Sequence, residues 1–77
     1  MLLEIITPDK KLFEGEVSSV MVPGKTGRFQ MLNGHAPIIS ALKKGKIKIK
    51  TSQGIQYFDV NGGVVEMQKN KIIVLAE

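Results

Sequence analysis

The sequence predicts an all-β protein folded as one compact unit over residues 1–77. About eight short segments rich in β-branched and aromatic residues alternate with turn signals along the chain. No window repeats its apolar residues with the 3.6-residue period of an amphipathic helix. Many short strands with regularly spaced turns are typical of a β-sandwich or a β-barrel.

The N-terminal part contains two predicted strands. Residues 2–7 are apolar and β-branched, and a turn with Pro8 at its second position ends them. Residues 11–22 form a longer extended segment, whose apolar positions change parity between Val17 and Val20. A strand with one buried face keeps its parity, so we predict a bulge near Ser18 and Ser19. Such a bulge would let the strand bend from one sheet into another.

The stretch from Val22 to Ile39 is the most distinctive part of the chain. It holds two of the three prolines, three of the eight glycines, and the only arginine and histidine. We predict a glycine-bounded turn over residues 23–27, a short strand over residues 28–32 and a tight polar corner over residues 33–37. The glycine of the corner can adopt a positive φ that other residues resist. We expect contacts made by the protein to involve this stretch.

The remaining strands are predicted over residues 38–42, 46–50, 55–60, 64–67 and 72–75. Residues 46–50 alternate strictly, with Ile47 and Ile49 on one face and three lysines on the other. The sequence Asn61-Gly62-Gly63 predicts a hairpin of the Asn-Gly type between the strands that flank it. Shorter turns are expected at residues 52–54 and 69–70.

Composition narrows the function classes. The chain has no cysteine, which removes disulfides, thiolate nucleophiles and thiolate metal sites. No apolar run approaches the roughly 20 residues that span a bilayer, and the N-terminus does not resemble a signal peptide. We therefore expect a soluble protein. Its net charge is +4, and five of its ten lysines lie between positions 43 and 50.

The polar residues do not form a catalytic, metal or cofactor site. His35 has no second histidine or cysteine with which to bind a metal, and no nucleophile-elbow motif surrounds Ser40 or Asp59. The sequence Gly24-Lys25-Thr26-Gly27 lacks the spacing of a phosphate-binding loop. We predict that the protein is not an enzyme and that it binds no cofactor.

The lysines of residues 43–50 leave one alternative function open. A small β-barrel could use them to bind nucleic acid along a basic strand face. Such sites pair basic residues with exposed aromatic side chains, and no aromatic residue interleaves with these lysines in the sequence. A solvated strand face that discourages edge-to-edge pairing is the simpler interpretation, so we expect no nucleic-acid partner.

A family resemblance is carried by the sequence VPGKTGRFQMLNGHAPIISALKKGKIKI, which starts at Val22. The Pro-Gly-x-x-Gly turn, the Gly-His-Ala-Pro corner and the Leu-Lys-x-Gly turn occur in order and at the family spacing. Similar matches occur at Leu12-Phe13-Glu14-Gly15, at Gly62-Gly63 and at Val74-Leu75-Ala76. The chain thereby resembles the N-terminal domain of the ε subunit of F-type, proton-translocating ATP synthase.

The resemblance implies a flattened β-sandwich of two mostly antiparallel, five-stranded sheets with about 8–10 short strands. It also implies a non-catalytic subunit of the rotor that docks on the γ subunit and the c-ring and couples proton-driven rotation to ATP synthesis. The complex would lie at the cytoplasmic face of the bacterial inner membrane. The partner-binding residues implied by position are Arg28, Gly34, His35, Ala36, Pro37 and Ile38.

Three departures from the family pattern bear on these expectations. The match ends without the C-terminal helical hairpin that most members carry, so we expect a short form. Arg28 stands where many relatives have an acidic residue, which implies either a compensating change in the c-ring loop or a contact that has moved. Gln30 and Asn33 replace the usual glycine and proline, which changes the expected shape of the corner.

Overall fold

A computed structural model describes all 77 residues and contains nine strands joined by short turns. The strands are β1 (Leu2–Ile6), β2 (Lys11–Glu16), β3 (Ser19–Gly24), β4 (Gly27–Leu32), β5 (Ile38–Leu42), β6 (Gly45–Thr51), β7 (Gly54–Val60), β8 (Gly63–Gln68) and β9 (Lys71–Ala76). Every predicted strand is present, and the predicted all-β class is confirmed. The structure contains no helix that could cross a bilayer.

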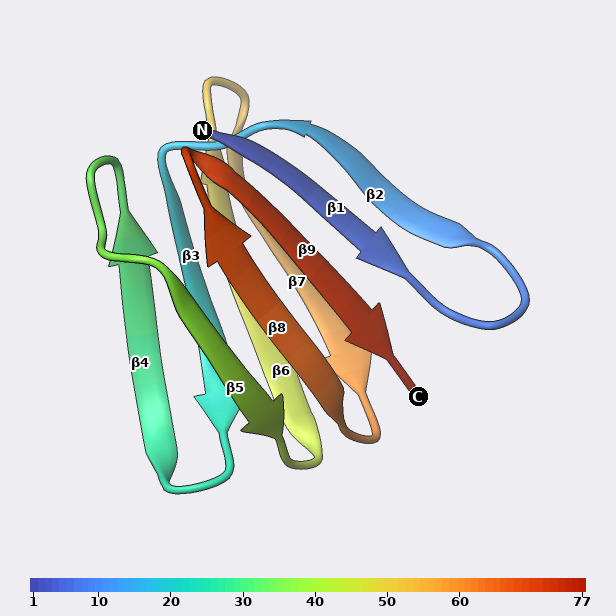
Figure 1. Ribbon diagram of the computed structural model, residues 1–77. Coiled ribbons are helices and arrows are strands. Elements are labelled where there is room, and N and C mark those ends of the chain that lie inside the picture. Colours follow the sequence, from blue (N-terminus) through green and yellow to red (C-terminus); the bar gives the residue numbers. More distant parts are fainter.

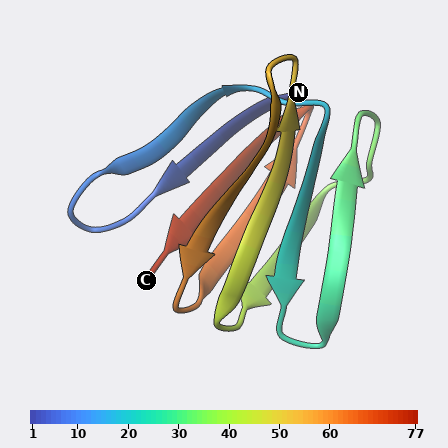
Figure 2. The same cartoon turned by 180° about the vertical axis from the view of Figure 1, so that it is seen from behind.

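The strands form two layers that pack face to face (Figures 1 and 2). Sheet I has the order β2-β1-β9-β8-β5, and sheet II has the order β7-β6-β3-β4. The sheets therefore have five and four strands, where the family resemblance implied five each. They meet along one side, where Gly24 of β3 pairs with Leu42 of β5. All strand pairs are antiparallel except β1 with β9.

The core lies between the two sheets and contains no buried polar side chain. Leu3, Ile5 and Val74 contribute to it from sheet I. Ile47 and Ile49 contribute from sheet II, and both are fully buried, as their alternation with lysines predicted. Phe13 of β2 and Phe58 of β7 close the open side of the sandwich, with ring centroids 5.8 Å apart.

The segment over residues 11–22 does bend from one sheet into the other, but without the predicted bulge at Ser18 and Ser19. The strand ends after Glu16 and a new strand begins at Ser19. The first part pairs with β1 in sheet I, and the second part pairs with β4 and β6 in sheet II. Because no single partner strand runs past the break, no bulge is needed there. The register shift lies instead at Leu12, between Phe13, which pairs with Ile5, and Lys11, which pairs with Ile6.

The predicted hairpin at Asn61-Gly62-Gly63 is wrong. In sheet II β7 pairs only with β6, whereas β8 pairs with β5 and β9 in sheet I. The two glycines, with φ of 145° and 138°, carry the chain from one layer to the other. An Asn-Gly signal predicts a tight turn but cannot show whether the flanking strands pair.

The other turns agree more closely with the sequence. Thr7 N–H donates to the Lys10 carbonyl over 2.8 Å, and Lys69 and Asn70 adopt positive φ between β8 and β9. The turn predicted over residues 23–27 is shorter than expected, because Pro23 and Gly24 belong to β3 and pair with β4. Only Lys25 and Thr26 form that loop.

Candidate docking surface

The polar corner over residues 33–37 carries the chain from β4 of sheet II to β5 of sheet I (Figure 1). His35 N–H donates to the Leu32 carbonyl over 3.0 Å, and Gly34 lies at φ 81° inside this turn. A φ of this kind is costly for other residues, so the glycine is required by the turn itself. The amide oxygen of Asn33 accepts a hydrogen bond from the N-terminal ammonium over 3.2 Å. The corner is therefore fixed in place although most of it is exposed.

The histidine of the corner is engaged locally. His35 Nδ1 lies 2.6 Å from the carbonyl oxygen of Ala36, which can only accept, so the Nδ1–H donates to it. Ser40 donates to the carbonyl of Ala41, and Asp59 pairs with Lys46, so neither residue contacts the imidazole. The structure contains no group of three or more histidine, cysteine, aspartate or glutamate residues that could hold a metal ion.

Arg28 lies at the opposite end of β4 from the corner (Figure 1). Four residue steps of β4 lead from Arg28 to Leu32, after which the corner begins, and they span about 13 Å at the rise of a β-strand. The Arg28 guanidinium donates to the carbonyl oxygen of Lys46 on β6 over 3.0 Å. Its cross-strand partner on β3 is Pro23, which has no N–H to offer to its neighbours. The structure thus separates Arg28 from the other predicted site residues, which lie together.

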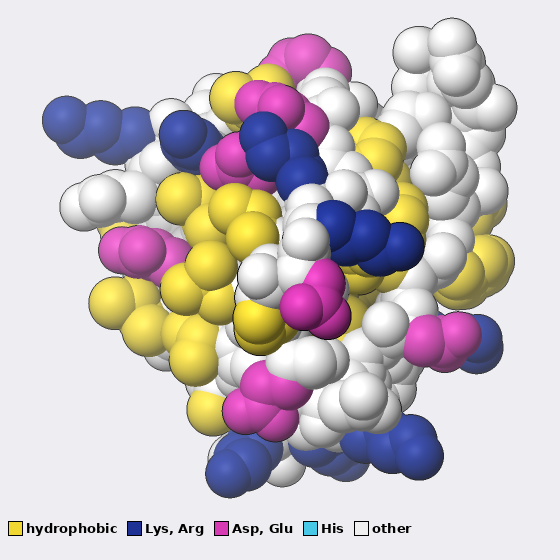
Figure 3. All heavy atoms as spheres, turned by 90° about the vertical axis from the view of Figure 1, so that its right-hand side faces the viewer, with side chains coloured by type: hydrophobic (Ala, Val, Ile, Leu, Met, Phe, Trp, Pro, Cys, Tyr) yellow, Lys and Arg dark blue, Asp and Glu magenta, His cyan; other side chains and the backbone are white.

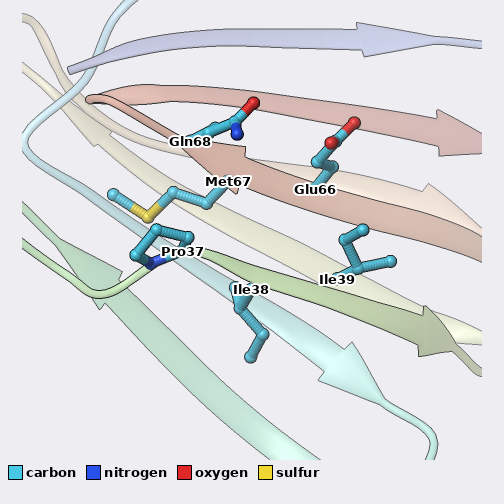
Figure 4. A pocket seen from close by; sticks show the side chains of 6 residues that line it. All are labelled: Pro37, Ile38, Ile39, Glu66, Met67 and Gln68. Carbon is cyan, nitrogen blue, oxygen red and sulfur yellow. The ribbon is translucent and has the colours of Figure 1, made fainter.

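A shallow pocket of about 320 Å³ adjoins the corner on sheet I (Figure 4). It is lined by Pro37, Ile38 and Ile39 at the start of β5 and by Glu66, Met67 and Gln68 of β8. Ile38 turns toward the core, whereas Ile39 is 73% exposed, more than any other large hydrophobic side chain. The sequence predictions reached Ile38 but did not include Ile39.

Exposed apolar side chains continue from this pocket across the outer face of sheet I. Val64 and Leu75 are cross-strand neighbours and are 41% and 55% exposed. Leu75 neighbours Ile6 on β1, and Val64 neighbours Ala41 on β5. Figure 3 shows the resulting continuous hydrophobic area beside acidic side chains. We call this surface the apolar band, and its members are Ile6, Ile39, Ala41, Val64 and Leu75.

The outer face of sheet I carries acidic groups beside the apolar band. Glu4 and Glu14 are cross-strand neighbours, and the ammonium of Lys11 lies 3.0 Å from Glu4 and 2.8 Å from Glu14. The hydrogen bond from Lys11 lowers the pKa of Glu14 below its ordinary value of 4.5. The same bond, followed by the bond to Glu4, raises the pKa of Lys11 above 10.5. The cluster holds β2, the edge strand, against β1.

Replacing Lys11 by methionine is expected to weaken the acid dependence of stability. A lowered pKa means that Glu14 stabilises the fold above about pH 4.5, and that this contribution is lost as the pH falls through the lowered value. Without Lys11, the free energy of unfolding should fall less steeply between about pH 5 and pH 3. Urea unfolding at a series of pH values measures this slope. Lys10→Met, which removes an exposed lysine without an ion pair, should leave the slope unchanged, and equal slopes for both variants would contradict the assignment.

The outer face of sheet II is basic. Lys46, Lys48 and Lys50 lie on it, and Lys46 pairs with Asp59 over 2.9 Å. Tyr57 of β7, which is 58% exposed, is the cross-strand neighbour of Lys48. An exposed aromatic residue therefore lies beside the lysines in space, although none interleaves with them in the sequence, because the tyrosine reaches this face from the neighbouring strand.

Comparison with known proteins identifies relatives of the whole chain. Residues 1–77 match the family described as the β-sandwich domain of the ATP synthase delta/epsilon chain. An ATP synthase epsilon chain from Chlorobium limicola is 46% identical over 76 residues, which cover 97% of this chain and 86% of the relative. An epsilon chain from Maridesulfovibrio salexigens is 42% identical over 77 residues, covering 100% of this chain and 54% of the relative.

Solved structures share the fold at low sequence identity. A chain in the mitochondrial ATP synthase of Euglena gracilis, solved as OSCP/F1/c-ring, superposes with a TM-score of 0.88 at 17% identity. The match covers 96% of this chain and 48% of that one. A chain in the central stalk and c-ring of the Tetrahymena thermophila enzyme superposes with a TM-score of 0.78 at 19% identity, covering 97% and 61%. These likenesses confirm the β-sandwich.

Proposed function

Because the chain belongs to the ATP synthase delta/epsilon family through its β-sandwich domain, we propose that it docks on the γ subunit and the c-ring of that complex. Members of the family are epsilon chains, which are accessory and non-catalytic subunits of ATP synthase. In this role residues 1–77 act as one domain that couples proton-driven rotation to ATP synthesis. The subunit would belong to the F1 sector at the cytoplasmic face of the bacterial inner membrane.

The apolar band supports this role most directly. Large exposed apolar surfaces on a small domain mark contacts with other proteins. The band is continuous with the pocket at Ile39 and with the corner that contains Gly34, His35, Ala36 and Pro37. A subunit contact that persists through rotation requires apolar area of this kind. We therefore assign the corner, Ile38 and the apolar band to the γ subunit.

Arg28 is assigned to the other partner. It lies at the opposite end of β4 from the corner, about 13 Å along the strand, so we expect different loops to meet the two. A single exposed guanidinium is better suited to a contact with the polar loops of a c-ring than to a contact with an apolar subunit face. The two contacts would then lie at the two ends of β4, and the strand would hold them at a constant separation.

The alternative of nucleic-acid binding is supported by the exposed aromatic ring of Tyr57 beside Lys48. It does not account for the apolar band on the opposite face. The family match over the whole chain favours the ATP synthase role.

Binding assays test the proposal directly. The chain should be retained by immobilised γ subunit and by detergent-solubilised c-ring, with dissociation constants at or below the micromolar range typical of specific protein contacts. Absence of binding to the γ subunit at micromolar concentration would refute the proposed function.

Replacing Arg28 by glutamate should affect coupling much more than folding. The side chain is exposed and loses one hydrogen bond to a carbonyl oxygen, so the free energy of unfolding should change by about 0.5 kcal/mol or less. Proton-driven ATP synthesis in reconstituted vesicles should fall, because the charge at the proposed c-ring contact is reversed. Lys10→Glu makes the same charge change at the β1–β2 turn and should leave synthesis intact. Unchanged assembly and synthesis with Arg28→Glu would remove Arg28 from the contact.

A further inference from the structure

The free edge of β7 carries few of the features that protect sheet edges. Natural proteins protect such edges with charges, bulges or covering segments. The edge of β2 carries Lys11 and Glu14 and a register shift at Leu12. The edge of β5 is joined to β3 through the pair of Leu42 with Gly24. The strands at the edges of sheet II each carry one charged residue, Arg28 near the start of β4 and Asp59 near the end of β7. From Gly54 to Phe58, β7 contains no charge and no proline, and its register with β6 is uninterrupted.

The backbone of β7 presents unpaired groups at regular intervals along this edge. Thr51 and Gly54 pair directly across the two-residue loop, and residues that flank such a loop exchange both hydrogen bonds. Because bonded and non-bonded pairs alternate, the N–H and carbonyl groups of Ile55, Tyr57 and Asp59 point away from β6. The edge therefore offers donors and acceptors to an additional strand.

The first half of β7 is also open on both faces. Ile55 is 51% and Tyr57 58% exposed on the outer face, and Gly54 and Gln56 are exposed as well. The contact of Phe58 with Phe13 closes the sandwich only beyond this point. Figure 2 shows β7 at the edge of sheet II, with the β6–β7 loop projecting beyond the neighbouring strands. An incoming strand would meet no side chain of sheet I along this half.

The lysines next to the edge determine which strand fits. Lys48 and Lys50 are the cross-strand neighbours of Tyr57 and Ile55, and neither forms an ion pair. A strand added to β7 would lie two strand spacings, about 10 Å, from β6. An extended lysine side chain of β6 and an extended glutamate side chain of the added strand can together span that distance, passing over the side chains of β7. Two acidic residues two positions apart would therefore face both free lysines.

We propose that the edge of β7 binds an extended acidic segment of a partner protein by strand addition. The main chain of the segment pairs with Ile55 and Tyr57, and its acidic side chains meet Lys48 and Lys50. This site lies in the sheet opposite the apolar band, so it does not depend on the proposed contact with the γ subunit.

A capped heptapeptide of alternating valine and glutamate is the probe, and heteronuclear NMR of the full chain is the measurement. The amides of Ile55 and Tyr57 should shift and become protected from hydrogen exchange. A peptide with lysine in place of glutamate should bind about tenfold or more weakly, as expected for two exposed ion pairs. A glutamate peptide with N-methyl groups on its pairing amides should not bind. Equal binding of the N-methylated peptide would overturn the proposal.

Two variants separate strand addition from other binding. Tyr57→Pro removes a backbone N–H that points to solvent, and edge strands tolerate proline at such positions. The variant should therefore fold but should not bind the peptide. The double variant Lys48→Glu, Lys50→Glu leaves the edge intact and should lose about tenfold in affinity for the glutamate peptide. Binding unaffected by both variants would overturn the proposal. The proposal would also be overturned if the same amides were protected because the chain associates with itself, as measured by sedimentation velocity. It would equally be overturned if a single-stranded oligothymidylate protected these amides and the peptide did not bind.

Discussion

Replacing Ile39 by glutamate is expected to abolish high-affinity binding to the γ subunit while the chain remains folded. The side chain is 73% exposed and adjoins both the pocket and the corner. Burying an isoleucine in a subunit contact contributes about 1.5–3 kcal/mol, which is about 10- to 150-fold in affinity. A carboxylate placed in an apolar contact, beside the existing carboxylate of Glu66, should increase the loss further. Titration calorimetry with purified γ subunit measures the change.

Ile55→Glu is the matched control for this experiment. Ile55 is also an isoleucine on the outer face of a strand and is 51% exposed, but it belongs to sheet II. The same substitution there should leave affinity for the γ subunit unchanged, and both variants should melt within a few degrees of the parent. If Ile55→Glu lost affinity and Ile39→Glu did not, the docking face would be on sheet II and the assignment of the apolar band would be wrong.

The individual strands could be predicted because their signals are local. Lysine and isoleucine alternate over residues 46–50, and Lys69-Asn70 marks a turn between two apolar runs. Both the strand and the turn were therefore placed correctly. Which strands pair is not a local property. The two glycines after Asn61 adopt positive φ, but they connect two layers because β7 and β8 each have other partners.

The candidate site was only partly predictable for the same reason. Arg28 and His35 were found because their residue types are rare in the chain, yet Arg28 lies near the start of β4 and His35 beyond its end, with the strand from Phe29 to Leu32 between them. The apolar band was missed because four strands contribute to it. A signal was present: in β9 the fully buried Val74 is followed by Leu75, so apolar residues point to both faces. A strand of this kind predicts a second covered face, here the one proposed to meet the γ subunit.

Replacing Gly63 by alanine is expected to have the largest effect on folding of any single change considered. Gly63 begins β8 at φ 138°, a conformation that side chains rarely adopt. It pairs with Leu42 on one side and with Ala76 on the other, so its backbone is fixed by two neighbouring strands. A Cβ atom would overlap the carbonyl oxygen of Leu75 and lie 3.0 Å from the Cα of Ala76. The obstruction is backbone of a central strand, which cannot rotate away.

Gly54→Ala isolates this obstruction from backbone strain. Gly54 has a similar φ of 121°, but a Cβ there would have no neighbouring atom within 4 Å. Its cost should be about 1–2 kcal/mol, whereas Gly63→Ala should cost about 4 kcal/mol or more. A domain of this size has a total stability of about 4–12 kcal/mol, so the second variant should lose about a third or more of it. Urea titration monitored by circular dichroism compares the two. Equal urea midpoints for the two variants would show that the crossover between the sheets relaxes to admit a side chain. The backbone at Gly63 would then be held less tightly than its pairing with β5 and β9 indicates.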